Sequence, residues 1–217
     1  MQPTANDPQG KSRGGKSRGG KSRSGKSRAG RPRAFNEAAA LDAATMVFWQ
    51  KGYEGASMAD LTNAMQLNRP SLYGAFGNKE QLFLQALQHY ARHQGQQAMR
   101  AFEAEPDIHQ AVRAFLETSL DVNTAGQASG CLLANCAATS AETIPEVKQI
   151  LIMMVDQVSQ RLLTRFEQEP LTQSSAAIIT RRLIDTMYAQ ALLARIGYSY
   201  QQLMNDLDDR VADIFRI

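Results

Sequence analysis

The spacing of apolar residues after Phe35 constrains the fold more than any other feature of the sequence. From there to the C-terminus apolar residues recur at intervals of three and four, and no alternating strand pattern is sustained. Gly and Pro interrupt the pattern repeatedly, as they do between helices. The sequence therefore predicts an all-α protein of about nine helices, at residues 36–51, 57–66, 69–76, 79–103, 107–123, 130–140, 144–168, 172–195 and 200–215.

Several of these helices carry recognisable start signals. The stretch SMAD begins at Ser57 and is a capping-box variant, with Asp60 in the position of the usual Glu or Gln. Asn78 is the expected N-cap of the helix that follows the short one. Because proline fits only the first turn of a helix, Arg69–Pro70 marks the start of that short helix.

The segment before Phe35 has a different composition. Residues 11–30 are four near-copies of the unit KSRGG and run into GRPR. Residues 1–33 carry a net charge of +9 and the remaining residues −6, within a total of +3. A segment so rich in Gly and Ser, with no large apolar side chain after Gln9, cannot offset the entropy lost on ordering. We expect residues 1–30 to be a disordered basic tail that contacts nucleic acid, with a solubilising role as the alternative.

Helix, short turn and short helix follow one another over residues 57–76, and a longer helix comes next. This order is typical of a helix-turn-helix, in which the second of the two helices enters the major groove of DNA.

The surrounding sequence resembles a known family. GRPRAFNEAAALDAATMVFWQKGYEGASMADLTNAMQLNRPSLYGAFGNKEQLFLQAL is similar to the DNA-binding domain of TetR-family transcriptional regulators over about residues 30–87. The motif FWQKGY at the end of the first helix carries the resemblance, together with the spaced signature Leu72-Tyr73-x-x-Phe76-x-x-Lys79-x-x-Leu82.

This resemblance implies a helix-turn-helix domain at residues 31–78 and an effector-binding and dimerisation domain at residues 79–217. The function it implies is sequence-specific regulation of transcription. We expect a repressor that binds a palindromic operator in double-stranded DNA as a homodimer and is released by a small-molecule effector. One short recognition helix reads few base pairs, so a two-fold pair is expected on physical grounds as well.

The resemblance also assigns DNA contacts to individual residues. Phosphate contacts are expected from Ser57, Tyr73 and Lys79, and contacts to base edges or thymine methyl groups from the start of the short helix. Its candidates are Arg69, Pro70, Ser71 and Leu72, although Leu72 and Phe76 are also candidates for the core of the unit. Independently of the resemblance, Asn68 at the start of the same helix is a further candidate DNA contact. GRPR is similar to the core of AT-hook segments, so Arg31 and Arg33 are expected in the minor groove.

The larger domain offers a dimer surface and a pocket. Residues 172–195 and 200–215 are expected to form an intersubunit four-helix bundle, or else to be internal core only. Their apolar stripes are Ile179, Leu183, Ile184, Met187, Tyr188 and Ala191, and Leu203, Leu207, Val211 and Ile214. An adaptable apolar effector pocket is expected from Phe102, Phe115, Cys131, Leu133, Met153 and Met154, for each of which ordinary core packing is the alternative.

Two further functions remain open at this point. Cys131 lies near the N-terminus of a predicted helix, where a thiolate is favoured, so a regulator that responds to oxidants or electrophiles through Cys131 or Cys136 is one alternative. Two inert buried thiols are the other interpretation. The second alternative is a non-specific architectural DNA-binding protein that uses the basic tail.

Other classes find no support in the sequence. His89 and His93 have a spacing that permits a metal pair, but without a third nearby ligand we expect solvated or capping histidines, no metal and no cofactor. No nucleophile–base–orienter set is recognisable, so we expect no enzyme activity. Since no run of eighteen apolar residues and no apolar stretch after the basic segment occurs, we expect a cytoplasmic, nucleoid-associated protein without a membrane span.

Overall fold

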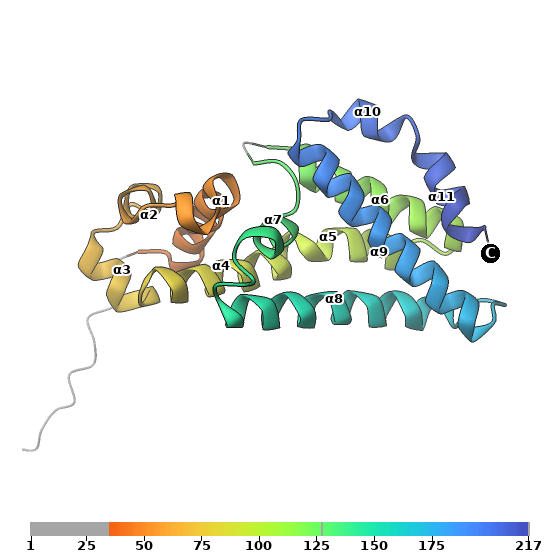
Figure 1. The fold of residues 1–217 in the computed structure, drawn as a ribbon, viewed down its shortest axis with the longest axis horizontal. Helices are drawn as coiled ribbons and strands as arrows, with labels where there is room; N and C mark the ends of the chain where they lie inside the picture. Colours follow the sequence, from red (N-terminus) through yellow and green to blue (C-terminus); the bar gives the residue numbers. More distant parts are fainter. Residues whose placement is uncertain (1–34, 127, 217) are drawn as a thin grey trace, which may run out of the picture. The chain divides into compact units, whose positions relative to one another are not determined.

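The computed structural model describes residues 35–126 and 128–216, which belong to one compact unit. Helices are the only regular secondary structure in this described part, which confirms the all-α class (Figure 1). They are α1 (Glu37–Gly55), α2 (Met58–Met65), α3 (Arg69–Phe76), α4 (Lys79–His93), α5 (Gly95–Ala104), α6 (Ile108–Thr124), α7 (Leu132–Thr139), α8 (Pro145–Phe166), α9 (Gln173–Arg195), α10 (Tyr200–Met204) and α11 (Leu207–Phe215). No helix in this part of the chain combines the length and the apolar character needed to cross a bilayer.

Each of the nine predicted helices is present, and two of them are interrupted. The helix expected at residues 79–103 has a break at Gln94, which separates α4 from α5. The helix expected at residues 200–215 is divided into α10 and α11. The first helix was expected to end at residue 51, and Gly52 does leave the helical conformation, with φ 70° and ψ 176°, although the helix assignment continues to Gly55.

The predicted start signals of the N-terminal helices are confirmed. Ser57 accepts a hydrogen bond from the Asp60 amide while the Asp60 carboxylate accepts one from the Ser57 amide, which completes the capping box. Asn78 caps α4 in the same reciprocal way with Gln81. Asn68 caps α3 through the amide of Ser71 at 2.9 Å. These contacts lie within three residues of each other in sequence, so the sequence alone fixes where α2, α3 and α4 begin.

The buried side chains gather in two large clusters. The first joins α1–α4 to α7 and to the start of α8, and its largest members include Phe48, Leu72 and Phe83. The second joins α5, α6, α9, α11 and the end of α8, and Phe102, Phe115 and Phe166 lie in it. The break at Gln94 therefore falls where the long segment from α4 to α5 passes from one cluster to the other.

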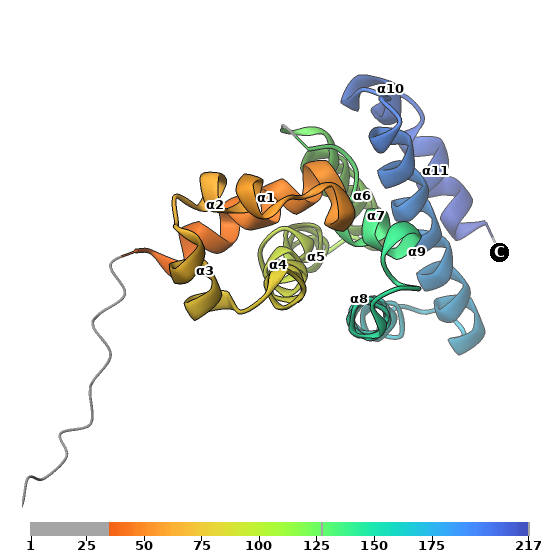
Figure 2. The ribbon, with the colours of Figure 1, turned by 60° about the vertical axis from the view of Figure 1, so that its left-hand side comes forward.

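Helix α7 holds a central position in the unit. It packs against α1, α4, α8 and α9, and Figure 2 shows it between α1 and α9. The short loop before α7 thus brings residues 128–131 close to the N-terminal helices, although some eighty residues separate them in sequence.

Candidate functional site

The start of helix α3 is exposed and largely polar. Arg69, Pro70 and Ser71 are exposed in its first turn, and Tyr73 follows with 48% of its surface accessible. The left-handed conformation of Gln66, with φ 53° and ψ 40°, ends α2 and sets the direction in which α3 leaves the turn. An exposed, rigidly capped helix with arginine and hydroxyl donors at its start is suited to reading base edges in a groove.

Leu72 does not belong to this exposed group. Its side chain is fully buried between α3 and the rest of the first cluster. The prediction that Leu72 contacts bases is therefore wrong, and the alternative that it is a core residue holds. Leu72 and Phe76 are four residues apart and so lie on the same side of α3, and both are buried there.

Lys79 is the first residue of α4, and its side chain lies beside Tyr53 of α1. Its ammonium lies 4.5 Å from the centroid of the Tyr53 ring, a cation–π distance that holds the charge near the N-terminus of α4. Free amides and a cation at one helix terminus together favour an anion such as phosphate.

Ser57 is exposed at the start of α2, and its hydroxyl already serves the capping box. Lys51 donates to Asp60 at 2.5 Å. The Lys51 ammonium, followed by the hydrogen bonds from Ser57, holds the pKa of Asp60 well below its usual range. The acidic cap therefore stays ionised at neutral pH, close to the surface on which phosphate contacts are expected.

The net charge of the helix-turn-helix segment is negative. Residues 35–78 contain four acidic and two basic side chains, a net of −2. Such a segment gains little from long-range attraction to a polyanion. The attraction would come instead from residues 1–33, with their net charge of +9. Arg31 and Arg33, which we expect in the minor groove, lie outside the described residues.

A cavity of about 380 Å³ lies in the larger part of the molecule. Four residues of the predicted effector set line it, namely Phe115, Cys131, Leu133 and Met154. Phe102 does not line it and is buried in the second cluster, while Met153 is on the outer face of α8 with 46% of its surface exposed. The structure adds lining residues that no local sequence pattern assigns to a pocket, among them Tyr90, Asn123 and Tyr188.

The two thiols are free; Cys136 is buried and Cys131 is half-buried. Cys131 is the N-cap residue of α7, but burial raises the pKa of its thiol despite nearby amide donors. Burial, with the nearby Cys131, raises the pKa of Cys136 to about 12. The expectation that the helix terminus favours a Cys131 thiolate is therefore wrong, because the loss of solvation outweighs the helix dipole.

One of the two histidines of α4, His89, is placed differently from what the sequence suggested, whereas His93 is exposed as expected. His89 is buried, and its Nε2 lies 2.5 Å from Asp42 Oδ1, so this residue joins α4 to α1 rather than facing solvent. Its ring lies 4.3 Å from that of His93. Within residues 35–126 and 128–216, no three acidic, histidine or cysteine side chains are arranged to hold a metal ion.

The predicted dimer stripes face inward. Ile179, Leu183, Leu207 and Ile214 are buried within their own chain. Large exposed apolar side chains gather at the C-terminal end of α9: Leu192 in its last turn, and Ile196 and Tyr198 just beyond it, with exposed fractions of 61%, 65% and 46%. An interface on α9 would therefore use other residues than the ones the apolar periodicity suggests.

Comparison with known proteins agrees with this geometry. Residues 40–86 match the family described as "Bacterial regulatory proteins, tetR family". A structure assigned as a TetR transcriptional regulator from Rhodococcus sp. RHA1 is 31% identical, with a TM-score of 0.55, over 81% of this chain and 97% of that one. The chain therefore belongs to the TetR family of regulatory proteins, not to an enzyme family.

Two further relatives bear on function. The TetR-family regulator CifR, solved as a cysteine mutant with 26-base-pair operator DNA, is 28% identical with a TM-score of 0.75, over 84% of this chain and 98% of that one. The HTH-type transcriptional repressor ComR of Escherichia coli (strain K12) is 35% identical over 112 residues, 48% of this chain. The match covers 51% of ComR, about half its length.

Proposed function

We propose that this protein is a sequence-specific transcriptional repressor that binds a palindromic operator as a homodimer and is released by a small molecule. The observation that carries the proposal is the exposed, capped start of α3, where Arg69, Ser71 and Tyr73 are all accessible to a ligand. The complex of CifR with operator DNA and the name of ComR as a repressor support it. Its place of action would be the cytoplasm, on the nucleoid.

Each group of residues has a distinct part in this proposal. Arg69 and Ser71, with Asn68 and Pro70 beside them, read base edges at the start of α3. Tyr73 and Lys79, together with Ser57 at the start of α2, bind phosphates and fix the register of α3 on the duplex. In functional terms the DNA-reading domain is then residues 31–78 and the effector domain residues 79–217.

The basic segment of residues 1–33, called the arm below, supplies the affinity that the helix-turn-helix segment of residues 35–78, called the head, lacks. Because residues 35–78 have a net charge of −2, most counterion release would come from the arm. Residues 1–29 contain eight basic side chains. Their deletion is expected to lower the slope of log affinity against log salt by up to about 7, at about 0.9 for each phosphate contact, while the operator preference is kept.

The homodimer is proposed through α9 together with α10 and α11. The exposed apolar end of α9, formed by Leu192, Ile196 and Tyr198, is the part of this surface that most needs a cover. Dimerisation would place two copies of α3 on one face, one helical turn of DNA apart. Substitution of Ile196 by Asp should therefore yield a monomer with weak operator binding.

The alternative of a redox- or electrophile-responsive regulator receives no support from the thiols, because their raised pKa values keep them protonated at neutral pH. The architectural alternative differs in its response to competitor DNA. If the protein bound DNA non-specifically through its arm, any competitor duplex would displace it from the labelled DNA equally well.

The test is fluorescence anisotropy on the duplex upstream of the protein's own gene, and on a duplex selected from random sequence for tight binding, at roughly 0.15 M salt. We expect at least one of these to bind more than a hundredfold tighter than a scrambled duplex. Equal binding to all three by the full chain, and none by a chain without residues 1–29, would leave the architectural function in place of the repressor.

A further inference from the structure

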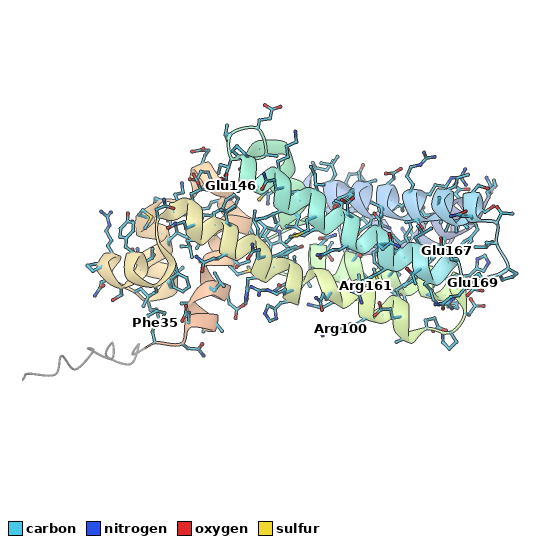
Figure 3. All side chains as sticks on the ribbon, turned by 90° about the horizontal axis from the view of Figure 1, so that it is seen from below. Phe35, Arg100, Glu146, Arg161, Glu167 and Glu169 are labelled. Carbon is cyan, nitrogen blue, oxygen red and sulfur yellow. The ribbon has the colours of Figure 1, made fainter. Side chains whose placement is uncertain are left out.

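The cavity has an apolar interior and an amide-rich mouth. Met99, Phe115 and Met187 line its inner wall. Gln96, Gln157 and Gln160 line its outer part and are exposed on α5 and α8. Figure 3 shows the side of the molecule from which α5 and α8 are seen, with Arg161 labelled. A ligand that enters here leaves water for a wall of sulfur, aromatic and aliphatic groups.

Charge is nearly absent from the lining. Arg161 is the one ionised side chain among the described residues that line the cavity. Its guanidinium already donates to Glu103 Oε1 from Nε at 3.0 Å and from Nη2 at 2.5 Å. The Tyr90, Tyr188 and Cys131 groups stay neutral because burial raises the pKa of each.

We infer that the effector of the proposed repressor is a neutral, largely apolar molecule with few hydrogen-bonding groups. A charged ligand would lose its hydration without meeting an available counter-charge, which is costly in an apolar cavity. Ser119 and Asn123, both buried in α6 and both lining the cavity, can bind a hydroxyl or amide of the ligand. The inference depends on the proposed function only for the effect of the ligand on DNA, not for its binding.

A matched pair of fluorescent probes tests the ligand class. N-phenyl-1-naphthylamine is neutral, and 1-anilinonaphthalene-8-sulfonate is the same scaffold with an anionic group. We expect the neutral probe to bind the full chain at least tenfold tighter than the sulfonate. Glu103→Gln should narrow this difference, because it releases Arg161 to pair with the sulfonate. Met154→Trp, which fills the cavity, should abolish binding of both probes.

Three results would overturn this inference. They are equal or tighter binding of the sulfonate to the unmodified chain, no binding of the neutral probe, and neutral-probe binding that Met154→Trp leaves unchanged. None of these measurements uses DNA, so their outcome does not depend on whether the protein is a repressor.

A second inference has a separate basis in a buried hydrogen bond. Trp49, on α1 of the DNA-reading unit, donates from its indole Nε1 to the carbonyl oxygen of Gly130 at 2.7 Å. Arg195 of α9 approaches both partners, with 3.4 Å from its Nη1 to the carbonyl oxygens of Trp49 and Ser129. The loop at Gly130 is thus joined to the first helix of the head and to the last turn of α9.

The same loop borders the cavity. Cys131 follows Gly130 directly and lines the cavity, as does Tyr90, whose ring meets the Trp49 ring edge-on at 4.9 Å. Gly130 has φ +74°, and a Cβ there would lie 2.8 Å from the carbonyl oxygen of Ala191, another lining residue. Gly130 is packed against Ala191 and accepts a hydrogen bond from Trp49. A ligand that displaces Cys131 or Ala191 should therefore move the loop, and with it Trp49.

The geometry points to Trp49 and Gly130 as positioning residues that transmit occupancy of the cavity to the DNA-reading unit. By thermodynamic reciprocity, DNA bound to the head must then change the affinity of the cavity for its ligand by the same factor. This coupling rests on the proposed function and can be measured before the natural effector is known.

The experiment measures the affinity of N-phenyl-1-naphthylamine with and without a saturating duplex selected for tight binding. We expect the duplex to weaken probe binding at least threefold in the full chain. Trp49→Phe, which keeps an aromatic ring and removes the donor, should bring this ratio close to one while the DNA affinity in the absence of probe stays within threefold. Arg195→Met should give an intermediate ratio and guards against misfolding of the tryptophan variant.

Asp42→Asn is the matched control, because it removes the charge from the contact between α1 and His89 of α4 and leaves the Gly130 hydrogen bond intact. It should keep the ratio of the unmodified chain. A folded Trp49→Phe variant with an unchanged ratio, or a ratio lost in Asp42→Asn instead, would overturn the inference in favour of coupling through α4. Failure to select any tight duplex would count against the repressor function itself.

Discussion

The DNA-reading unit depends on contacts between residues close in sequence, whereas the ligand cavity depends on packing between distant segments. On α3 the groups proposed to contact DNA are exposed. Their position depends on a helix cap formed by residues no more than three positions apart in sequence. In the cavity, the lining groups come from α4–α9 and from the loop before α7, and packing between distant segments holds them. A substitution on α3 should therefore affect either folding or DNA binding, whereas a substitution near the cavity should affect folding and coupling together.

The largest expected effect tests whether α3 separates residues that stabilise the fold from residues that contact DNA. Leu72→Ala removes a fully buried side chain and should cost about 2–5 kcal/mol of unfolding free energy. Tyr73→Ala, one position on, should change stability by less than about 0.5 kcal/mol and weaken operator binding at least tenfold. Urea denaturation and anisotropy measure the two effects. If Tyr73→Ala were as destabilising as Leu72→Ala, the separation of core and DNA-reading faces on α3 would be lost.

The next effect concerns the loop beside the cavity. Gly130→Ala places a Cβ in a left-handed conformation and against the Ala191 carbonyl oxygen, which should cost about 1–3 kcal/mol or more. Gly126→Ala is the control, because a Cβ there meets no atom within 4 Å. Thermal unfolding compares the two variants. Similar melting temperatures would mean that the loop yields easily and cannot transmit a displacement.

A smaller effect is expected from the caps of the head. Ser57→Ala removes the capping box of α2 and should cost about 0.5–2 kcal/mol. The pH dependence has a definite sign. The lowered pKa of Asp60 means that its contribution is complete above the ordinary carboxyl pKa and is lost as pH falls below it. Unfolding experiments from pH 7 to pH 3 should show a shallower loss of stability in Asp60→Asn than in the unmodified chain.

The smallest effect distinguishes the buried thiols from a sensor. With both pKa values raised by burial, the thiols should react with iodoacetamide much more slowly at pH 7.5 than those of the urea-unfolded chain, as mass spectrometry can measure. Above pH 9 the unfolded chain loses thiol protons that the folded chain retains, so stability should fall as pH rises. Faster reaction in the folded chain would revive the electrophile-responsive alternative.

Most of the head could be predicted from the sequence because its signals are short-range. The capping pairs Ser57–Asp60 and Asn78–Gln81 are three residues apart, and Pro70 restricts α3 by its own ring. What failed in the head was the direction of a single side chain. Leu72 lies between two exposed residues, and only the position of α3 against the first cluster shows that it points inward.

Only part of the cavity lining could be predicted from the sequence. An apolar side chain at helical spacing is favoured equally by a core, a cavity wall and a subunit interface, since all three remove it from water. Periodicity therefore could not separate Phe115, which lines the cavity, from Phe102, which does not, nor show that the stripe of Ile179 and Leu183 faces its own chain.

By itself, the sequence determined the helical class, the starts of α2, α3 and α4 and the uneven distribution of charge, because each of these depends on residues close together in the chain or on composition alone. Only the tertiary structure decided that His89 pairs with Asp42, that burial raises the pKa of Cys131, and that Trp49 donates to Gly130. Those features join residues 47 to 81 positions apart or depend on burial, and both follow from how helices pack rather than from any local pattern.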